Sequence, residues 1–580
     1  MKVRLAKTAG FCMGVRRAME MVLSAANKED GPLFTYGPLI HNKQVLDLLE
    51  SKNVRTIENI EEIKNLKKGT LLIRAHGIPP LQRRLLKDTP LKIIDATCPR
   101  VARVQAIIRY HTNKGSTAVI VGDRNHAEVI GLMGYSNNQA YVISSPSEVE
   151  GLPETDHLFV VAQTTQNLES YHEISEIIKA RYPGAIIFDT ICEATGERQR
   201  EIKSLAAHVD GVVVVGGYHS ANTRRLVQVS EGTGTPTFHI ETEKELERDA
   251  LSTMEVIGVT AGASTPHWMI KNVVKEIEAI RGRGETLIGR WIRNVSRFLL
   301  LSNFMAASGA FSLAYAAAIL SGRRPDLFNP LLAFLYVYSM HVLNRFLDKG
   351  AGTYNDPDRA SFYSKHKFFL IVSAIISIMG ALVLSYRLGI SIFLIMAGLS
   401  ILGIIYSIPV VPVSIRHRWK YSKIKDIPGS KTISEAFAWA VIIALPPLLE
   451  PLGIGLGSVI ILFLVVLLMS YIRSIFFDMF HVQGDLIVGV ETLPITLGEK
   501  KTIIHLKWII VIGSLLLVTA PFFRLVTLFS LLLLITFVTI TLCLTAYENH
   551  RIYPGPCLEY LMEGNFLLAG VLGLIWQVLS

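Results

Sequence analysis

A short apolar run ends in polar residues and a cysteine at Lys92-Ile-Ile-Asp-Ala-Thr-Cys98. Six further runs of this kind end in small polar clusters, at 71–76, 118–123, 158–165, 185–192, 211–217 and 256–264. Continuous β-branched runs that alternate with helical stretches are typical of parallel strands buried on both faces. Ligands of such sheets bind beyond the carboxyl ends of the strands, so the polar ends of these runs are candidate site residues.

The 580 residues divide into two regions of different composition. Residues 1–281 carry charges of both signs and have the composition of a soluble α/β domain, whereas residues 298–580 alternate long apolar runs with short basic loops. Residues 282–297 are expected to form a linker with an interfacial amphipathic helix, because Trp291 and Val295 lie among arginines. The N-terminus lacks the apolar core of a signal peptide, which predicts a cytosolic first half.

The formal net charge of +10 raises the question of a nucleic-acid partner. No Lys/Arg run with interleaved aromatic residues occurs, and much of the excess charge lies beside the apolar segments. The charge therefore favours membrane lipid over nucleic acid as the partner.

Three of the five cysteines fall in Gly- or Thr-rich loops of the soluble half: Cys12, Cys98 and Cys192. Their nearly even spacing predicts three comparable α/β units that each give one thiol to a shared centre. A disulfide framework is not expected of so few cysteines in the cytosol. Three thiolates suit an iron–sulfur cluster, which normally takes four and here would keep one iron open to substrate. A Cys₃ zinc site and three buried structural thiols are the alternatives.

Three histidines and several neutral hydrogen-bonding residues occupy similar loop positions. Neutral donors around one pocket suit a diphosphate group. Glu128 lies two residues after one of these histidines and is a candidate proton donor to a substrate carbon or oxygen. A single histidine is more often structural, so the prediction depends on the whole set. The set is His41, His76, His126, Thr164, Ser220, Asn222 and Ser264.

Nine apolar segments are long enough, or nearly so, to cross a hydrocarbon core that needs about 20 residues. They lie at about 298–320, 327–347, 367–386, 388–412, 431–450, 452–475, 503–521, 524–547 and 558–579. With a cytosolic N-terminus, 21 Lys and Arg residues lie in or beside the inward connections and four in the outward ones. This positive-inside asymmetry predicts an integral protein of the inner or plasma membrane whose two halves both work at the cytosolic face.

Polar residues of the membrane half gather where two segments enter inward loops. Asn344 and Asp348 lie four residues apart at the end of the second segment, and Asp478 and Asp485 lie in the loop after the sixth. Carboxylates of two cytosolic loops could together hold Mg²⁺ ions that bind a prenyl diphosphate. Ordinary loop charge is the plainer reading, but an Asn and an Asp on one helix face near membrane depth favour a site.

Eight motifs follow one another along the soluble half: Gly10-Phe-Cys-Met-Gly-Val15, Gly37-Pro-Leu-Ile-His-Asn42, Arg74-Ala-His-Gly77, Asp95-Ala-Thr-Cys-Pro99, Asn125-His-Ala-Glu128, Gln163-Thr-Thr165, Ser220-Ala-Asn-Thr-Arg-Arg225 and Gly262-Ala-Ser-Thr-Pro266. In these motifs and their order, the soluble half resembles the LytB family of 4-hydroxy-3-methylbut-2-enyl diphosphate reductases over residues 1–281. The resemblance implies a [4Fe–4S] cluster on Cys12, Cys98 and Cys192 that takes the substrate hydroxyl. It also implies that a ferredoxin- or flavodoxin-type donor supplies two electrons and that the hydroxyl leaves as water, which gives isopentenyl and dimethylallyl diphosphates.

The same resemblance assigns roles to the polar residues. Glu128 would be the proton source. Tyr218-His219 and Ala221 depart from residues that are frequent in the family, and Ala221 keeps only a backbone N–H where a Ser hydroxyl is common. We expect this to alter affinity and to leave the chemistry intact. The diphosphate would be bound by His41, His76, His126, Thr164, Ser220, Ala221, Asn222 and Ser264.

The membrane half resembles the UbiA-type prenyltransferase superfamily over about residues 285–580. The nine segments, the two polar motifs and the string Gly489-Val-Glu-Thr-Leu-Pro494 carry the resemblance. It implies that Mg²⁺ and a prenyl diphosphate are bound by Asn344, Asp348, Asp478 and Asp485. Gly352 and His481 stand where the family usually has acidic residues. An active transferase and a non-catalytic membrane anchor are therefore both open, whereas a redox module for other membrane chemistry fits the intact reductase motifs poorly.

Overall fold

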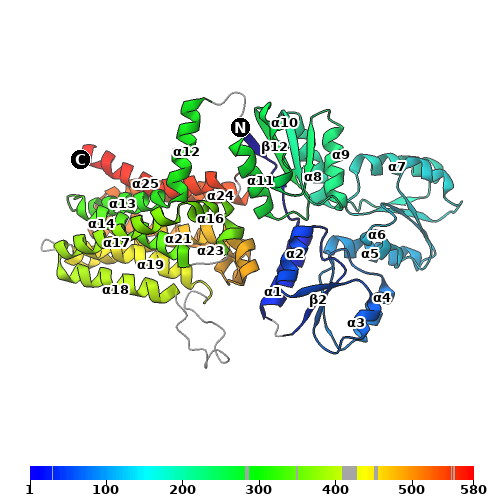
Figure 1. Cartoon of the computed structure of the whole chain (residues 1–580), viewed down its shortest axis with the longest axis horizontal. Helices are drawn as coiled ribbons and strands as arrows, with labels where there is room; N and C mark the ends of the chain where they lie inside the picture. Colours follow the sequence, from blue (N-terminus) through cyan, green and yellow to red (C-terminus); the bar gives the residue numbers. More distant parts are fainter. Residues whose placement is uncertain are drawn as a thin grey trace. The chain divides into compact units, whose positions relative to one another are not determined.

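The computed structural model describes residues 1–28, 31–280, 286–347, 351–407, 427–449, 455–549, 552 and 555–579. The chain divides into two units, Met1–Glu285 and Thr286–Ser580 (Figure 1). The first unit alternates strands and helices, and the described residues of the second unit are helical or connect helices.

The first unit contains three four-stranded sheets, in which every strand pair is parallel. The predicted α/β fold of three similar units is confirmed. In spatial order, one sheet is β3 (Val54–Ile57), β2 (Leu33–Tyr36), β4 (Thr70–Ile73) and β5 (Lys92–Asp95). The next is β7 (Ala140–Ile143), β6 (Thr117–Val121), β8 (Leu158–Ala162) and β9 (Ile186–Ile187). The last is β1 (Lys2–Leu5), β12 (Val256–Ala261), β10 (Gly211–Val215) and β11 (Thr237–Ile240).

Helices on both faces explain why the inner strands are continuously apolar. All five residues of β8 and of β10 are buried, so neither face of these strands meets water. The helices of this unit are α1 (Met13–Lys28), α2 (Lys43–Ser51), α3 (Ile60–Lys64), α4 (Pro80–Lys87), α5 (Pro99–Thr112), α6 (Ala127–Met133), α7 (Leu168–Arg181), α8 (Glu193–Ala206), α9 (Ala221–Glu231), α10 (Arg248–Ser252) and α11 (His267–Ala279).

Each sheet presents a cysteine from the same topological position. The edge strands β5, β9 and β1 lead into the loops that carry Cys98, Cys192 and Cys12, and each loop opens the next long helix: α5, α8 or α1. Parallel strands and their following helices repeat one hand of connection, which brings the three loops to equivalent places. The even cysteine spacing in the sequence reflects this repetition.

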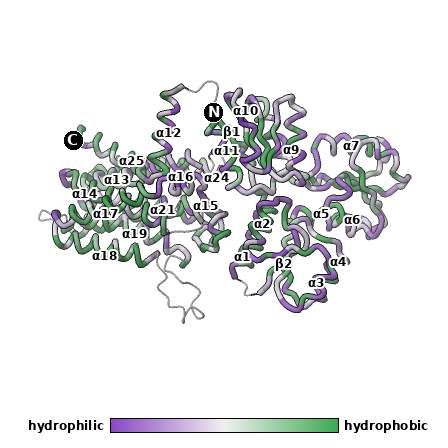
Figure 2. Tube along the Cα trace, in the orientation of Figure 1, coloured by the Kyte–Doolittle hydropathy of each residue, from purple (hydrophilic) through white to green (hydrophobic). Residues whose placement is uncertain are grey.

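The second unit is built from helices that are hydrophobic along much of their length (Figure 2). Its core contains buried side chains from most of these helices, among them Trp439, Phe476 and Phe566. The helices are α12 (Leu287–Leu301), α13 (Phe304–Leu320), α14 (Phe328–Leu347), α15 (Ala351–Asn355), α16 (Pro357–Lys365), α17 (Lys367–Leu388), α18 (Ile390–Ser407), α19 (Ser430–Ala444), α20 (Pro446–Leu449), α21 (Leu456–Val488), α22 (Leu493–Leu497), α23 (Glu499–Thr519), α24 (Phe529–Glu548) and α25 (Pro556–Leu579).

The prediction of nine membrane spans is wrong. Among the described residues, six helical segments are long and apolar enough to cross a membrane, or seven if α12 and α13, bent by 73° at their junction, count as one. α18 is too short in its described part. α14 does not qualify, and its last turns carry His341, Asn344 and Arg345. The second unit therefore has the composition of an integral membrane domain with fewer candidate spans than its apolar segments suggest.

Two predicted loops are helical instead. α21 continues without interruption to Val488, so Asp478 and Asp485 lie on its last turns and not in a loop after it. Residues 351–355 and 357–365 form the short helices α15 and α16. Hydropathy falls at these polar residues although the backbone stays helical, because their side chains find partners inside the helix bundle.

Candidate functional site

The three cysteines come together at the N-terminal ends of three helices. Cys98 and Cys192 are the N-cap residues of α5 and α8, and Cys12 directly precedes α1. A Cβ atom placed on Gly14, in the first turn of α1, would lie 2.5 Å from Cys98 Sγ and 4.0 Å from Cys12 Sγ. Glycine at this position therefore leaves the room that the two sulfur atoms occupy.

The helix ends favour thiolates at this centre. Burial raises the pKa of the Cys98 and Cys192 thiols, and backbone N–H groups of the first helical turn partly oppose that rise. Cys12 and Cys192 raise the pKa of Cys98 further, because neighbouring thiolates repel one another. A cationic metal centre among the three sulfur atoms would remove the repulsion and stabilise all three thiolates.

Three converging thiols can hold either a single zinc ion or an iron–sulfur cluster that leaves one iron without a protein ligand.

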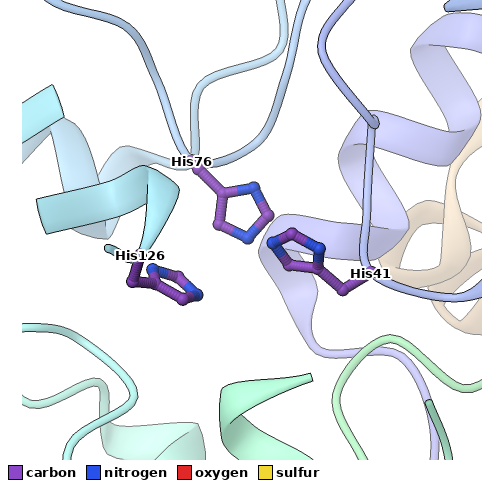
Figure 3. Close-up of side chains that lie close together, drawn as sticks. All are labelled: His41, His76 and His126. Carbon is purple, nitrogen blue, oxygen red and sulfur yellow. The ribbon is translucent and has the colours of Figure 1, made fainter. Parts of the chain in front are cut away.

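His41, His76 and His126 form the second feature of the site, and their side chains point toward one another (Figure 3). The ring centroids are 4.7 Å apart for His41 and His76, 5.4 Å for His76 and His126, and 5.7 Å for His41 and His126. One ring nitrogen of each histidine lies within 4.8 Å of the other two. The three residues follow β2, β4 and β6, so the carboxyl ends of strands from two sheets face a common pocket.

Several buried donors in this pocket lack a partner within the described residues. His41 Nε2, His76 Nδ1 and Asn222 Nδ2 are buried and make no hydrogen bond there. His126 Nδ1 accepts the Glu128 backbone N–H at 3.2 Å, so the proton of the neutral His126 ring lies on Nε2. Such unsatisfied groups cost free energy until a ligand with several acceptor oxygens, such as a diphosphate, binds them.

The charge around the histidines also favours an anion. Burial lowers the pKa of all three, to about 4 for His126 and well below 6.5 for His76. Arg74 lowers each of them further, because its positive charge repels an imidazolium. The rings are therefore neutral at pH 7 beside a permanent cation. A negatively charged ligand would be attracted by Arg74 and would raise the pKa of the three rings, whereas a metal cation would be repelled by Arg74.

Glu128 is a buried carboxyl group held by a single residue. The Thr164 backbone N–H donates to Glu128 Oε1 at 2.7 Å, and Thr164 Oγ1 donates to Oε2 at 2.9 Å. Burial raises the pKa of Glu128 to about 7, although the two Thr164 bonds pull the pKa down. A carboxyl group poised near neutral pH has the proton affinity that a general acid needs.

The other predicted site residues follow two strands of the third sheet, β10 for Ser220 to Asn222 and β12 for Ser264. Ser220 caps α9, its hydroxyl accepts the Thr223 N–H at 3.4 Å, and Ala221 and Asn222 form the first turn after it. Ser264 Oγ donates to the backbone carbonyl of His41 at 3.1 Å, which joins the loop after β12 to the histidine loop.

The membrane unit places its acidic residues on one long helix. Asp478 and Asp485, both 3% exposed, lie two turns apart on α21. Asp478 accepts a hydrogen bond from Thr432 Oγ1 at 2.7 Å, and Asp485 accepts one from Asn355 Nδ2 at 2.8 Å. Asn344 Oδ1 is buried without a hydrogen-bond partner among the described residues. Asp348 lies outside the described residues.

The two carboxylates that could replace the missing acidic residues are engaged by arginines. Asp358 pairs with Arg297 at 2.7 Å. Asp356 caps α16 and lies 3.4 Å from the Arg359 Nε atom. These ion pairs weaken the idea that Asp356 or Asp358 compensates for Gly352 and His481 as a metal ligand.

Comparison with known proteins identifies both halves. The LytB protein family matches residues 3–278. The 4-hydroxy-3-methylbut-2-enyl diphosphate reductase of Opitutus terrae is 39% identical over 289 residues, which are 48% of this chain and 100% of that protein. The chain belongs to the LytB family. Its second half is a UbiA prenyltransferase family domain, matched over residues 304–567.

Two further proteins resemble the LytB domain. The 4-hydroxy-3-methylbut-2-enyl diphosphate reductase of Caldanaerobacter subterraneus is 41% identical over 286 residues, which are 49% of this chain and 99% of that protein. The solved reductase of Plasmodium falciparum is 28% identical, with a TM-score of 0.46, over 47% of this chain and 87% of that chain. Membership of the LytB family implies an iron–sulfur cluster and a prenyl diphosphate substrate, in agreement with the thiol centre and the anion-binding pocket.

Two sets of buried charged residues in the LytB–UbiA chain are not evident from the sequence. Arg198, only 5% exposed, lies on α8 beside the cysteine centre. In the UbiA domain, Arg473 Nη1 donates to Glu435 at 2.6 Å and Arg473 Nη2 donates to Glu563 at 2.5 Å. A sequence pattern predicts each of these charged residues to be solvent-exposed. Only their contacts in the folded chain show that residues far apart in the sequence meet in the interior.

Proposed function

We propose that the N-terminal half reduces 4-hydroxy-3-methylbut-2-enyl diphosphate to isopentenyl and dimethylallyl diphosphates. Two electrons and two protons convert the C–O bond to a C–H bond and release water. The convergence of three helix-capping thiols, Cys12, Cys98 and Cys192, supports this proposal most directly. A one-electron carrier of the ferredoxin or flavodoxin type would deliver the electrons in two steps.

The diphosphate end of the substrate is held by the histidine pocket. His41, His76 and His126 donate to phosphate oxygens, and Asn222 offers the Nδ2 donor that has no partner among the described residues. The remaining contacts would come from Ser220, the Ala221 N–H and Ser264. Thr164 assists through Glu128, because its N–H and its hydroxyl both donate to that carboxyl group. Binding at several fixed points holds the five-carbon chain in one orientation, which raises the effective concentration of its hydroxyl at the thiol centre.

Glu128 supplies a proton in this scheme, and Thr164 positions it. The two Thr164 bonds fix both carboxyl oxygens, so the acid keeps one orientation while the substrate binds. A [4Fe–4S] cluster on Cys12, Cys98 and Cys192 would supply electrons and one iron without a protein ligand as a Lewis acid for the hydroxyl. The protein excludes water by burying Glu128 at 1% exposure.

Metal analysis of the full chain, purified anaerobically, tests the reductase proposal. We expect about four iron and four sulfide per chain and the absorbance of a [4Fe–4S] protein. The reduced sample should convert the hydroxylated C5 diphosphate to the two products. A sample without iron, or with a tightly bound zinc ion instead, would contradict the proposal.

We further propose that the UbiA domain, residues 298–580, binds a prenyl diphosphate through Mg²⁺ and transfers the prenyl group to a lipophilic acceptor. Asp478 and Asp485 are buried acceptors of hydrogen bonds from Thr432 and Asn355, and carboxylate oxygens are the ligands that Mg²⁺ prefers. Lys431 Nζ lies 3.7 Å from Asp478 Oδ1 and would compete with Mg²⁺ for this carboxylate. Asn344 and Asp348 would complete the site. Residues 282–297, between the reductase at 1–281 and this domain, would link the two and rest on the cytosolic face of the inner or plasma membrane.

A non-catalytic anchor is the second candidate function of the UbiA domain. Gly352 and His481 remove two usual carboxylates, and Asp356 and Asp358 are engaged by arginines. Fewer carboxylates weaken Mg²⁺ binding, which would leave the domain only the role of holding the reductase at the membrane.

Asp478→Asn with Asp485→Asn separates these two functions. Asparagine keeps the size and one acceptor oxygen of each residue but removes the charge that holds Mg²⁺. Prenyl transfer should fall by about two orders of magnitude or more, with reductase turnover unchanged. Glu548→Gln, at an exposed pair with Lys507, is the matched control. Wild-type chain without Mg²⁺-dependent transfer would establish the anchor instead.

A further inference from the structure

Arg198 is a buried cation without a carboxylate partner in the described residues. Its side chain is 5% exposed, and its Nε atom is buried with no hydrogen-bond partner there. The guanidinium Nη1 donates to the Ala194 carbonyl at 3.1 Å, and Nη2 donates to the Gly10 carbonyl at 2.7 Å. A buried charge is costly unless an opposite charge lies close by, so the fold requires an anion near Arg198.

Among the charged groups around Arg198, the thiols of the centre have the largest effect on it, ahead of Glu197 and Glu201 on the same helix. Cys12 and Cys192 both act on Arg198, where their negative charge opposes the lowering of its pKa by burial. Gly10 and Ala194, the two carbonyl acceptors, lie two residues from Cys12 and from Cys192 in the sequence. The Ala194 bond lies within the first turns of α8, whereas the Gly10 bond joins this helix, which begins directly after Cys192, to the loop of Cys12. Arg198 also lies within electrostatic reach of both thiols.

The loop of Cys12 depends on α8 at a second point. Glu201 accepts the Thr8 backbone N–H at 2.8 Å and the Thr8 hydroxyl at 2.6 Å. Glu201 and Arg198 thus fasten the segment from Thr8 to Gly10 onto the helix that begins at Cys192. Arg198 is the member of this pair that lies near the sulfur atoms.

We propose that Arg198 is a positioning residue of the reductase that clamps two cluster ligands together and raises the reduction potential of the cluster. The inference rests on the proposed [4Fe–4S] cluster. A cluster with three thiolate ligands is anionic and gains one negative charge when it accepts an electron. A buried guanidinium stabilises the more negative, reduced form, so its charge makes reduction easier.

Three variants of the full chain separate the clamp from the charge. Arg198→Met keeps the length of the side chain but loses both the hydrogen bonds and the charge. Arg198→Lys keeps the charge and cannot reach both carbonyls in the geometry of a guanidinium. Arg200→Gln is the matched control, because Arg200 is an exposed arginine on the same helix, two residues away.

Cluster potential and iron release are the two measurements. In a redox titration followed by electron paramagnetic resonance, Arg198→Met should titrate at a more negative potential than Arg200→Gln, and Arg198→Lys should stay close to that control. Iron release to a chelator should be about tenfold faster or more in both Arg198 variants, because each loses a hydrogen bond from a charged donor.

Either result can overturn the inference. Equal potentials of Arg198→Met and Arg200→Gln would remove the role of the charge, and unchanged iron release in Arg198→Lys would remove the clamp. If Arg198→Met does not accumulate, the test uses Arg198→Lys, which keeps the charge. A cluster potential of Arg198→Lys well below that of Arg200→Gln would then show that the charge does not set the potential. If the wild-type chain contains no iron, the cluster proposal itself is contradicted. If the wild-type chain contains the cluster but its potential and iron release do not change in the Arg198 variants, only the role of Arg198 is contradicted.

Discussion

Glu128→Gln is expected to keep the iron–sulfur cluster and to lose on the order of 10³-fold in turnover. Glutamine has the same size and still accepts the Thr164 N–H, so the pocket keeps its shape. The amide cannot donate a proton as the carboxyl group does, so the substrate loses its general acid. Turnover of the hydroxylated C5 diphosphate should be measured beside iron counts. Glu176→Gln, an exposed glutamate on α7, is the control. Unchanged turnover in Glu128→Gln would remove this residue from the mechanism.

The pH dependence of turnover gives a second measurement of the same acid. Burial raises the pKa of Glu128 from 4.5 to about 7, so the carboxyl is protonated below about pH 7 and ionised above it. Because the protonated form donates, kcat/KM should fall as the pH rises through 7, by up to about tenfold per pH unit. Thr164→Val removes one bond that lowers this pKa and should move the fall to higher pH. A profile that stays flat in the wild type would contradict the assignment.

The sequence predicts seven of the twelve strands of the soluble half. The seven apolar runs all contain strands, and their polar ends carry the site residues. The runs miss β1, β2, β3, β7 and β11. Exposed residues interrupt β1 and β3, as in Val54-Arg-Thr-Ile57, whereas β2 is fully buried but only four residues long. Arg198 could not be predicted, because an arginine on a charged helix such as α8 is usually solvent-exposed.

The structure of the membrane half is harder to predict because a hydropathy profile scores each residue without regard to the partners that its side chain has on other helices. Arg473 pairs with Glu435 and Glu563 inside the bundle. Further along α21, Asp478 and Asp485 accept hydrogen bonds from Thr432 and Asn355, so the helix continues through residues that a hydropathy profile assigns to a loop. The opposite error occurs at α14 and α18, where apolar segments predict spans although α14 ends in polar residues and the described part of α18 is short. The sequence also predicts a loop around Asn355, whose bond to Asp485 depends on a helix that only the fold reveals.

The histidine pocket couples substrate binding to protons. In the free pocket, burial and Arg74 keep the pKa values of His41, His76 and His126 below 6.5, so the rings carry no charge at pH 7. A bound diphosphate brings negative charge to rings whose centroids lie 4.7 to 5.7 Å apart, which raises these pKa values. The complex therefore takes up protons, and affinity falls as the pH rises by up to about tenfold per pH unit for each proton taken up.

His76→Asn should lower kcat/KM for the C5 diphosphate by about ten- to a hundredfold and take up fewer protons on binding. The loss equals one charge-assisted hydrogen bond, about 1.5–3 kcal/mol, from the most buried of the three rings. Calorimetry of diphosphate binding in two buffers with different ionisation heats counts the protons, above about pH 7.5 where the ligand itself no longer titrates strongly. His172→Asn, an exposed histidine on α7, should match the wild type in both measurements. Equal proton uptake together with an equal kcat/KM in His76→Asn and wild type would mean that the diphosphate does not bind at His76.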